Sequence, residues 1–148
     1  MFSIEAVNDP ERRDVVHARL RASNAEHSSV IRALGGTSAR EAVPLHVFAT
    51  GPDGELAGGA IGHLQWHWLH LELLWVDARH RGSGLGSRLV ARAEEEARTV
   101  HGAVGSQVET WDFQAPDFYR RLGYELVATI DDYPPGVANH LLTKRFGS

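Results

Sequence analysis

Hydrophobic positions follow two different spacings along the chain, and these spacings predict where strands and helices lie. Apolar runs and alternations predict strands over residues 2–7, 45–50, 56–66, 70–76, 104–110, 124–130 and 137–145. Apolar positions three and four residues apart predict helices over 10–22, 24–34, 84–101 and 116–122. The resulting order, β-α-α-β-β-β-α-β-α-β-β, predicts an α/β chain of the α+β kind, with a mixed sheet and helices on its faces.

Residues with helix-capping chemistry mark several of these boundaries. Asp9 is a good N-cap because its side chain can accept a backbone N–H, and Pro10 suits the first helical turn. Asn24 is predicted to cap the second helix. The apolar side of the helix over 84–101 is formed by Leu85, Leu89, Val90, Ala93, Ala97 and Val100. The three consecutive glutamates at 94–96 are expected mostly to face water.

The composition is that of a globular protein, and its length predicts one domain over 1–148. There is no cysteine, which excludes disulfides and thiolate chemistry. A formal net charge of −4 argues against nucleic acid as a partner and mildly favours an amine-bearing one. The chain has neither an apolar run as long as a membrane span nor an N-terminal secretory pattern, so we expect a cytoplasmic protein that does not bind membranes.

A glycine-rich turn carries the strongest chemical signal in the sequence. Gly82, Gly84 and Gly86 stand at alternate positions between the apolar strand over 70–76 and a long helix. Backbone N–H groups without neighbouring Cβ atoms, together with the positive end of the helix dipole, favour phosphate oxygens. Arg81 adds a fixed positive charge. The turn therefore predicts a diphosphate site.

Three known phosphate-binding patterns can be compared with this turn. A Walker loop needs a lysine after the glycines, and none is present. A dinucleotide fingerprint needs the spacing Gly-x-Gly-x-x-Gly in a first βαβ unit, and this turn comes after several strands. The pattern Arg/Gln-x-x-Gly-x-Gly/Ala is matched at every fixed position by Arg81-Gly82-Ser83-Gly84-Leu85-Gly86.

This hexamer resembles the signature of the GNAT superfamily, the Gcn5-related N-acetyltransferases, which bind acetyl-CoA. A second segment, Phe113 to Tyr124, resembles that family's later motif, and the likeness extends over about 45–146. The resemblance implies a GNAT-like acyl-CoA N-acyltransferase fold, with a mixed, mostly antiparallel central sheet and helices on both faces. It also implies that the strand over 70–76 splays from the strand over 104–110.

The same resemblance implies which residues bind acetyl-CoA. The backbone of Leu74, Trp75 and Val76 would pair with the pantetheine arm like an added strand. The pyrophosphate would be held by Arg81, Gly82, Ser83, Gly84, Leu85, Gly86 and Ser87. Asp112, Ala115 and Phe118 of the second segment would complete the site. Asp112 stands where many members have asparagine, and a carboxylate cannot donate a hydrogen bond to that arm.

Tyr119 and Glu72 are the candidate catalytic residues. A phenol is neutral at pH 7 and can protonate a departing thiolate, so Tyr119 is the candidate general acid; the alternative is a core aromatic. Glu72 lies in an otherwise apolar strand and is the candidate base, with a structural ion pair as the alternative. Strand alternation predicts that positions 70, 72, 74 and 76 share one face. His70 is the rival base, and a free amine could also bind without a dedicated one.

Two further clusters favour simpler interpretations. His63, His67 and His70 have helical spacing, but they lie in a predicted hairpin, so we expect no metal site. The loop over 131–136 carries two adjacent acids and reads either as a solvated turn or as a lid that attracts a cationic acceptor. Glu109, with Asp112, could line the acceptor site.

These observations together predict an enzyme, an acetyl-CoA-dependent N-acetyltransferase that acts on the primary amine of a small molecule such as an amino sugar or an antibiotic. Two alternatives stay open. One is a protein N-terminal or lysine acetyltransferase, and the other is a non-catalytic acyl-CoA-binding sensor. The family resemblance also implies a homodimer that pairs through the late strands.

Overall fold

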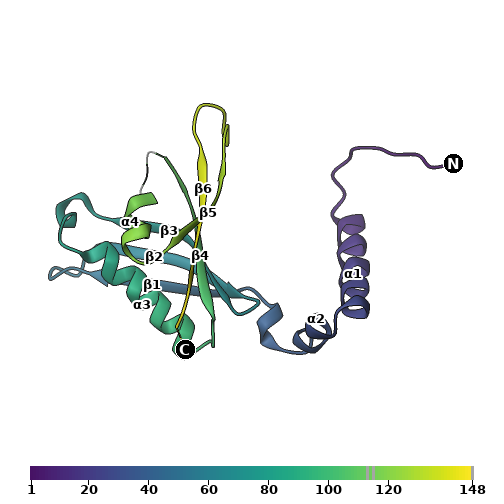
Figure 1. The fold of residues 1–148 in the computed structure, drawn as a ribbon, viewed down its shortest axis with the longest axis horizontal. Helices are drawn as coiled ribbons and strands as arrows, with labels where there is room; N and C mark the ends of the chain where they lie inside the picture. The colour runs from purple at the N-terminus through teal and green to yellow at the C-terminus, as the bar shows by residue number, and fades with distance from the viewer. Residues whose placement is uncertain (113, 115, 148) are drawn as a thin grey trace. The chain divides into compact units, whose positions relative to one another are not determined.

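The computed structural model describes residues 1–112, 114 and 116–147, and it divides into two units, Met1–Arg40 and Glu41–Ser148. Figure 1 labels the elements of both units. The described part of the chain has no helix long and apolar enough to cross a bilayer. The single domain expected over 1–148 stays a prediction.

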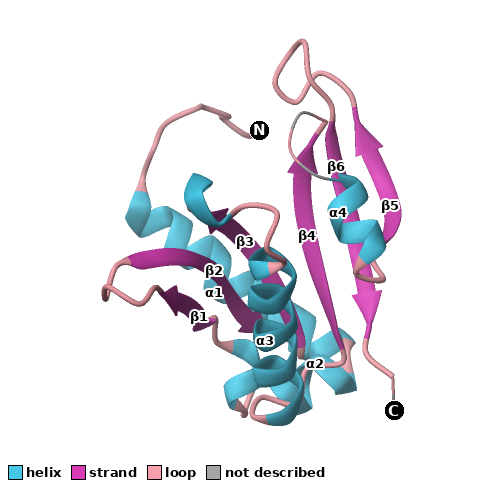
Figure 2. Cartoon of the chain, turned by 90° about the vertical axis from the view of Figure 1, so that its left-hand side faces the viewer, coloured by secondary structure: helices cyan, strands magenta, loops and turns pink. Residues whose placement is uncertain are grey.

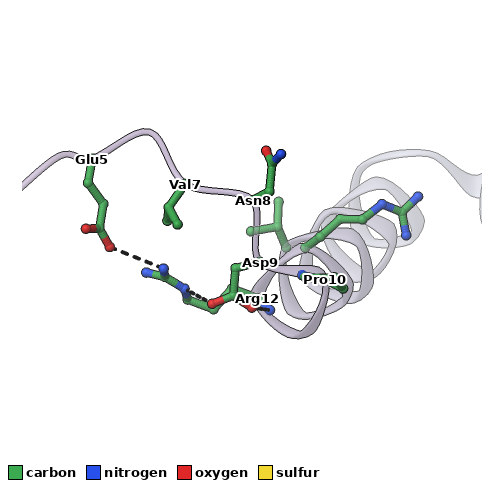
Figure 3. A pocket seen from close by; sticks show the side chains of 8 residues that line it. Glu5, Val7, Asn8, Asp9, Pro10 and Arg12 are labelled. Atoms are coloured by element: carbon green, nitrogen blue, oxygen red, sulfur yellow. Dashed lines mark hydrogen bonds and ion pairs between the residues drawn. The ribbon is translucent and has the colours of Figure 1, made fainter.

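The first unit is helical. It contains α1 (Pro10–His27), α2 (Ser29–Leu34) and the short 3-10 helix η1 (Ser38–Arg40). Asp9 caps α1 by accepting the backbone N–H of Arg12 at 3.0 Å, and the Arg12 guanidinium contacts Asp9 at 2.6 Å and Glu5 at 3.2 Å (Figure 3). These hydrogen bonds from Arg12 lower the pKa of Asp9. The predicted cap and first turn of this helix are confirmed.

Two expectations for the first unit are wrong. Residues 2–7 form no strand, because an apolar alternation becomes a strand only where a neighbouring strand pairs with it. Asn24 does not begin the second helix. It lies inside α1, where its carbonyl accepts the N–H of Ser28 at 2.9 Å. Ser28 is the N-cap of α2 and accepts the N–H of Ile31 at 3.2 Å.

The second unit is built on a six-stranded sheet (Figure 2). Its strands are β1 (Val43–Thr50), β2 (Leu56–Gln65), β3 (Trp68–Val76), β4 (Gly105–Trp111), β5 (Glu125–Ile130) and β6 (Asn139–Arg145), in the spatial order β1-β2-β3-β4-β6-β5. All pairs are antiparallel except β3 with β4. The chain passes from β3 to β4 through the short η2 (Ala78–His80) and α3 (Leu85–Thr99), as a parallel crossover requires.

The core lies between one face of this sheet and the helices α3 and α4 (Pro116–Arg121). The predicted apolar side of α3 is confirmed at four positions, because its buried residues are Leu89, Val90, Ala93 and Ala97. These side chains form one cluster with Leu45, Leu64, Leu69, Leu71, Val108, Tyr119, Tyr124 and Leu142. Val100, expected on the same side, is instead exposed beyond the end of the helix.

A polar chain crosses the edge of this core. The Tyr124 hydroxyl lies 2.8 Å from both the buried Ser106 hydroxyl and the Glu94 carboxylate, to which it donates. Lys144 binds the other oxygen of Glu94, also at 2.8 Å. Glu94, whose side chain is 12% exposed, therefore does not face water as Glu95 does. Its hydrogen bond with Tyr124 and its ion pair with Lys144 hold its side chain against the sheet.

The strand β5 lies at the edge of the sheet, where its apolar side chains are exposed. Leu126, Val127 and Ile130 are each 41% to 58% exposed. An edge strand of this kind can pair with a second chain. The homodimer expected through the late strands stays a prediction.

Replacing Tyr124 by phenylalanine tests the polar chain. The change leaves the fully buried Ser106 hydroxyl without its partner, so we expect the free energy of unfolding to fall by about 1–3 kcal/mol in urea denaturation. The control is Tyr133→Phe, at a side chain that is 51% exposed, which should change it by less than about 0.5 kcal/mol. Equal effects of the two variants would contradict this account of the network.

Candidate active site

A cleft opens where β3 and β4 stop pairing. Their parallel register runs from Trp68 opposite Gly105 to Leu71 opposite Val108 and ends there, and the two strands then diverge (Figure 2). The divergence leaves a cleft of about 330 Å³. Its lining residues are Glu72, Leu73, Leu74, Trp75, Val108, Glu109, Thr110, Gln114, Phe118 and Tyr119.

The last residues of β3 keep one hydrogen-bonding edge toward the cleft. Leu74, Trp75 and Val76 pair with β2 on their other side, opposite Ala60, Gly59 and Gly58. Because β4 no longer pairs with them, the opposite edge can accept an added extended chain. This geometry is the one expected for a pantetheine arm, although the role of these three residues stays a prediction.

The glycine-rich turn leads from β3 into α3 in a conformation that favours glycine. Gly82 and Gly84 both have φ of +80°, and a Cβ at either position would meet no other atom within 4 Å. Gly84 is the N-cap of α3 and has no side chain to satisfy the helix amides. The first backbone bond of the helix runs from the Arg88 N–H to the Gly84 carbonyl at 3.2 Å. The earlier amides of the turn are left for another acceptor.

The charge around this turn favours an anion. The first turn of α3 contains no acidic residue that would neutralise its positive end. The Arg81 Nε donates to the Val76 carbonyl at 3.2 Å, which holds the guanidinium beside the turn. Ser83 donates to the His80 carbonyl, so its side chain helps to shape the turn. Ser87 follows in the first helical turn.

The third glycine of the motif has a different role. A Cβ on Gly86 would lie 3.4 Å from the Phe118 ring and 3.7 Å from a Val76 methyl group. Gly86 thus faces α4 and the end of β3, where a Cβ would make ordinary van der Waals contacts, while Leu85 begins the helix beside it. Phe118 was expected to contact the cofactor, and it lines the cleft while packing against this helix.

The second segment turns partly away from the cleft. The Asp112 carboxylate accepts hydrogen bonds from the His140 Nε2 and, at 3.0 Å, from the Ala138 N–H. The hydrogen bond from His140, then that from Ala138, lowers the pKa of Asp112. Both of its oxygens thus have partners on or beside β6. Its expected contact with the cofactor stays a prediction. Ala115, also expected there, lies outside the described residues.

Gln114 is a cleft residue that sequence reasoning missed. Its Oε1 accepts the Trp111 N–H at 3.1 Å and the Thr110 hydroxyl at 3.3 Å. The sequence offered a signal for it. Asp112 replaces the asparagine of many family members and cannot donate a hydrogen bond, whereas Gln114, two residues later, carries an amide with two N–H donors. The neighbouring Trp111 indole donates to the Tyr133 carbonyl at 2.7 Å and so ties the 131–136 loop to β4.

Tyr119 reaches the cleft from α4, on the helix-covered face of the sheet. It is 7% exposed and packs edge-to-face against Phe118 and Tyr124. Burial raises the pKa of Tyr119 to about 12. A phenol in this environment holds its proton firmly at neutral pH, as a general acid must before it acts. The core and catalytic interpretations of Tyr119 are therefore compatible.

Glu72 reaches the cleft from the other face of the sheet, at a bulge in β3. Ile61 pairs with Leu73 and Gly62 with Leu71, which leaves Glu72 as the extra residue. The bulge requires Gly62, since a Cβ there would lie 2.3 Å from the His70 carbonyl oxygen. Figure 2 shows β3 beside β2 in this region.

The expectation that positions 70, 72, 74 and 76 share one face is wrong. Leu74 packs against the core, and Val76 approaches the N-terminus of α3, whereas Glu72 and Leu73 are both exposed. His70 and Glu72 do share a face, but the extra residue at the bulge shifts the alternation by one position, so Leu74 and Val76 lie on the opposite one. Glu72 therefore opposes Tyr119 across the sheet.

His70, the rival base, is half-buried, and its ring nitrogens have hydrogen-bond partners within the protein. Its Nδ1 contacts the Gln107 amide on β4, and it also bonds to the backbone of Gln65. Burial, and then the charge of nearby His63, lowers the pKa of His70. A neutral imidazole has one donor and one acceptor, and both are engaged here. This arrangement favours Glu72 over His70 as the proton acceptor.

Comparison with known proteins identifies the family to which this site belongs. Residues 14–124 match the family model described as the acetyltransferase (GNAT) family. Among curated relatives, the blasticidin-S acetyltransferase of Streptomyces morookaense is 62% identical over 129 residues, which cover 85% of this chain and 95% of that protein.

Solved structures agree with the family match. An acetyltransferase from Bacillus cereus superimposes with a TM-score of 0.79 at 23% identity, covering 97% of this chain and 98% of that one. Nourseothricin acetyltransferase superimposes with a TM-score of 0.62 at 30% identity, covering 69% and 65%. The split between β3 and β4 and the glycine turn before α3 thus lie in a chain that belongs to the GNAT family and is an acetyl-CoA-dependent N-acetyltransferase.

Proposed function

We propose that this enzyme acetylates a primary amine of a small, cationic antibiotic-like molecule, with Tyr119 as general acid and Glu72 as proton acceptor. The observation that carries the proposal is the cleft between β3 and β4, which Tyr119 lines from one face of the sheet and Glu72 from the other. A thioester inserted between the strands would have an acid on one side and an acceptor for the amine's proton on the other.

Acetyl-CoA binding is assigned to the turn and the two diverging strands. The free amides of 82–87 and the Arg81 guanidinium bind the pyrophosphate, because unsatisfied N–H groups and a helix N-terminus both favour anions. The open edge of Leu74–Val76 binds the pantetheine arm. A backbone N–H near Val76 polarises the thioester carbonyl. Phe118 packs beside that arm, and Asp112 supports the site through β6.

The proposed reaction balances with these two side chains. The acceptor arrives as an ammonium ion, and Glu72 takes one proton from it through a water molecule. The neutral amine attacks the thioester carbon, so that a C–N bond forms and the C–S bond breaks. Tyr119 gives its phenolic proton to the thiolate and recovers the second proton lost by the nitrogen. Glu72 then releases its proton to solvent, which leaves an amide and free CoA thiol.

The acceptor class rests on charge and on relatives. The described residues that line the cleft include the carboxylates Glu72 and Glu109 and no lysine or arginine, which favours a cationic acceptor. A relative that is 62% identical is named as a blasticidin-S acetyltransferase, and that match supports a small antibiotic over a protein substrate. The acids of the 131–136 loop, tied to β4 through Trp111, add to the negative charge nearby.

Replacing Gly84 by leucine tests the phosphate cradle. A side chain at this position projects into the space proposed for the pyrophosphate, so we expect the Kd for CoA in calorimetry to rise at least about tenfold. Gly54→Leu is a matched control, because Gly54 has φ of +79° and equally open surroundings in the β1–β2 turn. The control should bind CoA normally. Equal weakening in both variants, or none in either, would refute the cradle.

Replacing Tyr119 by phenylalanine tests the general acid. We expect kcat to fall by roughly 10²-fold with little change in the Kd for acetyl-CoA. Because the pKa of Tyr119 is raised to about 12, its phenol stays protonated across the working range. The loss should therefore be constant between about pH 6 and about pH 10, when followed by thiol release. A variant with wild-type kcat would remove Tyr119 from the mechanism.

Competing acceptors test the substrate class. With acetyl-CoA present, blasticidin S should release CoA thiol and gain one acetyl group by mass spectrometry. Its kcat/KM should exceed that of a lysine-containing peptide with a free N-terminus by at least about tenfold. Faster acetylation of the peptide would favour a protein acetyltransferase. Tight acetyl-CoA binding without turnover of any amine would favour a non-catalytic sensor.

A further inference from the structure

Four polar side chains from three strands gather on the face of the sheet opposite α3 and α4. His63 comes from β2, His70 and Glu72 come from β3, and Gln107 comes from β4. Their positions follow from the register, because His63 pairs with His70 and His70 with Gln107. The only one of the four that lines the cleft among the described residues is Glu72.

The contact between His63 and Glu72 fixes one oxygen of the carboxylate. The His63 Nδ1 lies within hydrogen-bonding distance of the Glu72 Oε1. An ionised carboxylate only accepts, so the Nδ1 must carry the proton and donate it. The Glu72 side chain is 49% exposed, and without this partner it would sample several rotamers. The bond restricts Glu72 to one orientation and leaves its Oε2 available at the cleft.

His63 is itself held in place by its neighbour. Its ring stacks on the His70 ring, with centroids 4.5 Å apart and planes within 5°. His70 is anchored to β4 by Gln107 and to the backbone of Gln65. A neutral His70 presents no second cation to the His63 ring. The other titratable side chain on this face of β4 is Glu109, which lines the cleft.

We propose that His63 is a positioning residue for acetyl transfer, which holds Glu72 through its Nδ1–H so that the free carboxylate oxygen meets the incoming amine. This role rests on the proposed function, in which Glu72 accepts the proton. The sequence pattern assigns His63 to a predicted hairpin, which does not favour a metal site there. The pairing of His63 with His70 makes Glu72 the diagonal neighbour of His63 on the same face, which brings the two side chains together.

Two substitutions at His63 separate positioning from packing. Asparagine places an amide donor close to where Nδ1 lies, whereas leucine fills similar space without a donor. We expect His63→Leu to lower kcat about tenfold and leave the KM for acetyl-CoA within about twofold. His63→Asn should retain most of kcat. His46→Leu, at an exposed histidine of β1, is the control and should match the wild type.

A double-mutant cycle with Glu72→Gln measures whether the effects of the two substitutions on kcat are coupled, and a purely structural role of His63 would not produce such coupling. If His63 acts through Glu72, His63→Leu should cost almost nothing further in kcat in the Glu72→Gln background. Additive losses, or equal losses in the asparagine and leucine variants, would overturn the proposal. A wild-type kcat for Glu72→Gln alone would instead overturn the assignment of Glu72 as proton acceptor, which distinguishes the two failures.

NMR of the His63 ring in the wild type and in Glu72→Gln tests the proposal even if the His63→Leu variant does not fold. Imidazole nitrogen chemical shifts report which ring nitrogen is protonated. We expect the His63 Nδ1 to carry a proton at neutral pH and its resonance to move in the Glu72→Gln variant. An unprotonated Nδ1 in the wild type, or a resonance that ignores the loss of the carboxylate, would overturn the proposal.

Discussion

The termination of β3–β4 pairing after four residue pairs is the constraint on which the site depends. Beyond Leu71, the edge of β3 that paired with β4 faces a gap. The backbone N–H and C=O groups along this edge need partners, and an extended chain carrying amides can supply them. The fold thus provides a binding edge inside the sheet, where an intact sheet would have used the same groups for its own stability.

The helices keep this gap aligned with the phosphate site. α3 starts at Gly84 directly after the strand that forms one wall, and α4 packs onto it where the Phe118 ring meets Gly86. One end of the cleft therefore lies beside the positive terminus of α3, with the Phe118 ring facing Gly86.

Sequence patterns predicted the elements that depend on local residue spacing. They failed where the structure depends on contacts between residues distant in the sequence. The amphipathic stripe of α3 and the glycine turn were readable because helix periodicity and turn chemistry are local. The strand over 2–7 was not formed, since its alternation has no pairing partner in the sheet. Likewise, Glu94 is half-buried because Tyr124 and Lys144, distant in sequence, reach it.

The same reason explains why the candidate site was only partly predictable. Glu72 and Tyr119 stood out by residue type, but a strict alternation of two cannot anticipate a bulge. The bulge exists because Gly62, on the neighbouring strand, admits the His70 carbonyl at a distance that a Cβ would forbid. By shifting the alternation, it turns Leu74 and Val76 toward the core, while Glu72 stays with His70 on the opposite face. A glycine on β2 thereby determines that Leu74 and Val76, and not the exposed Leu73 and Trp75, turn toward the helices.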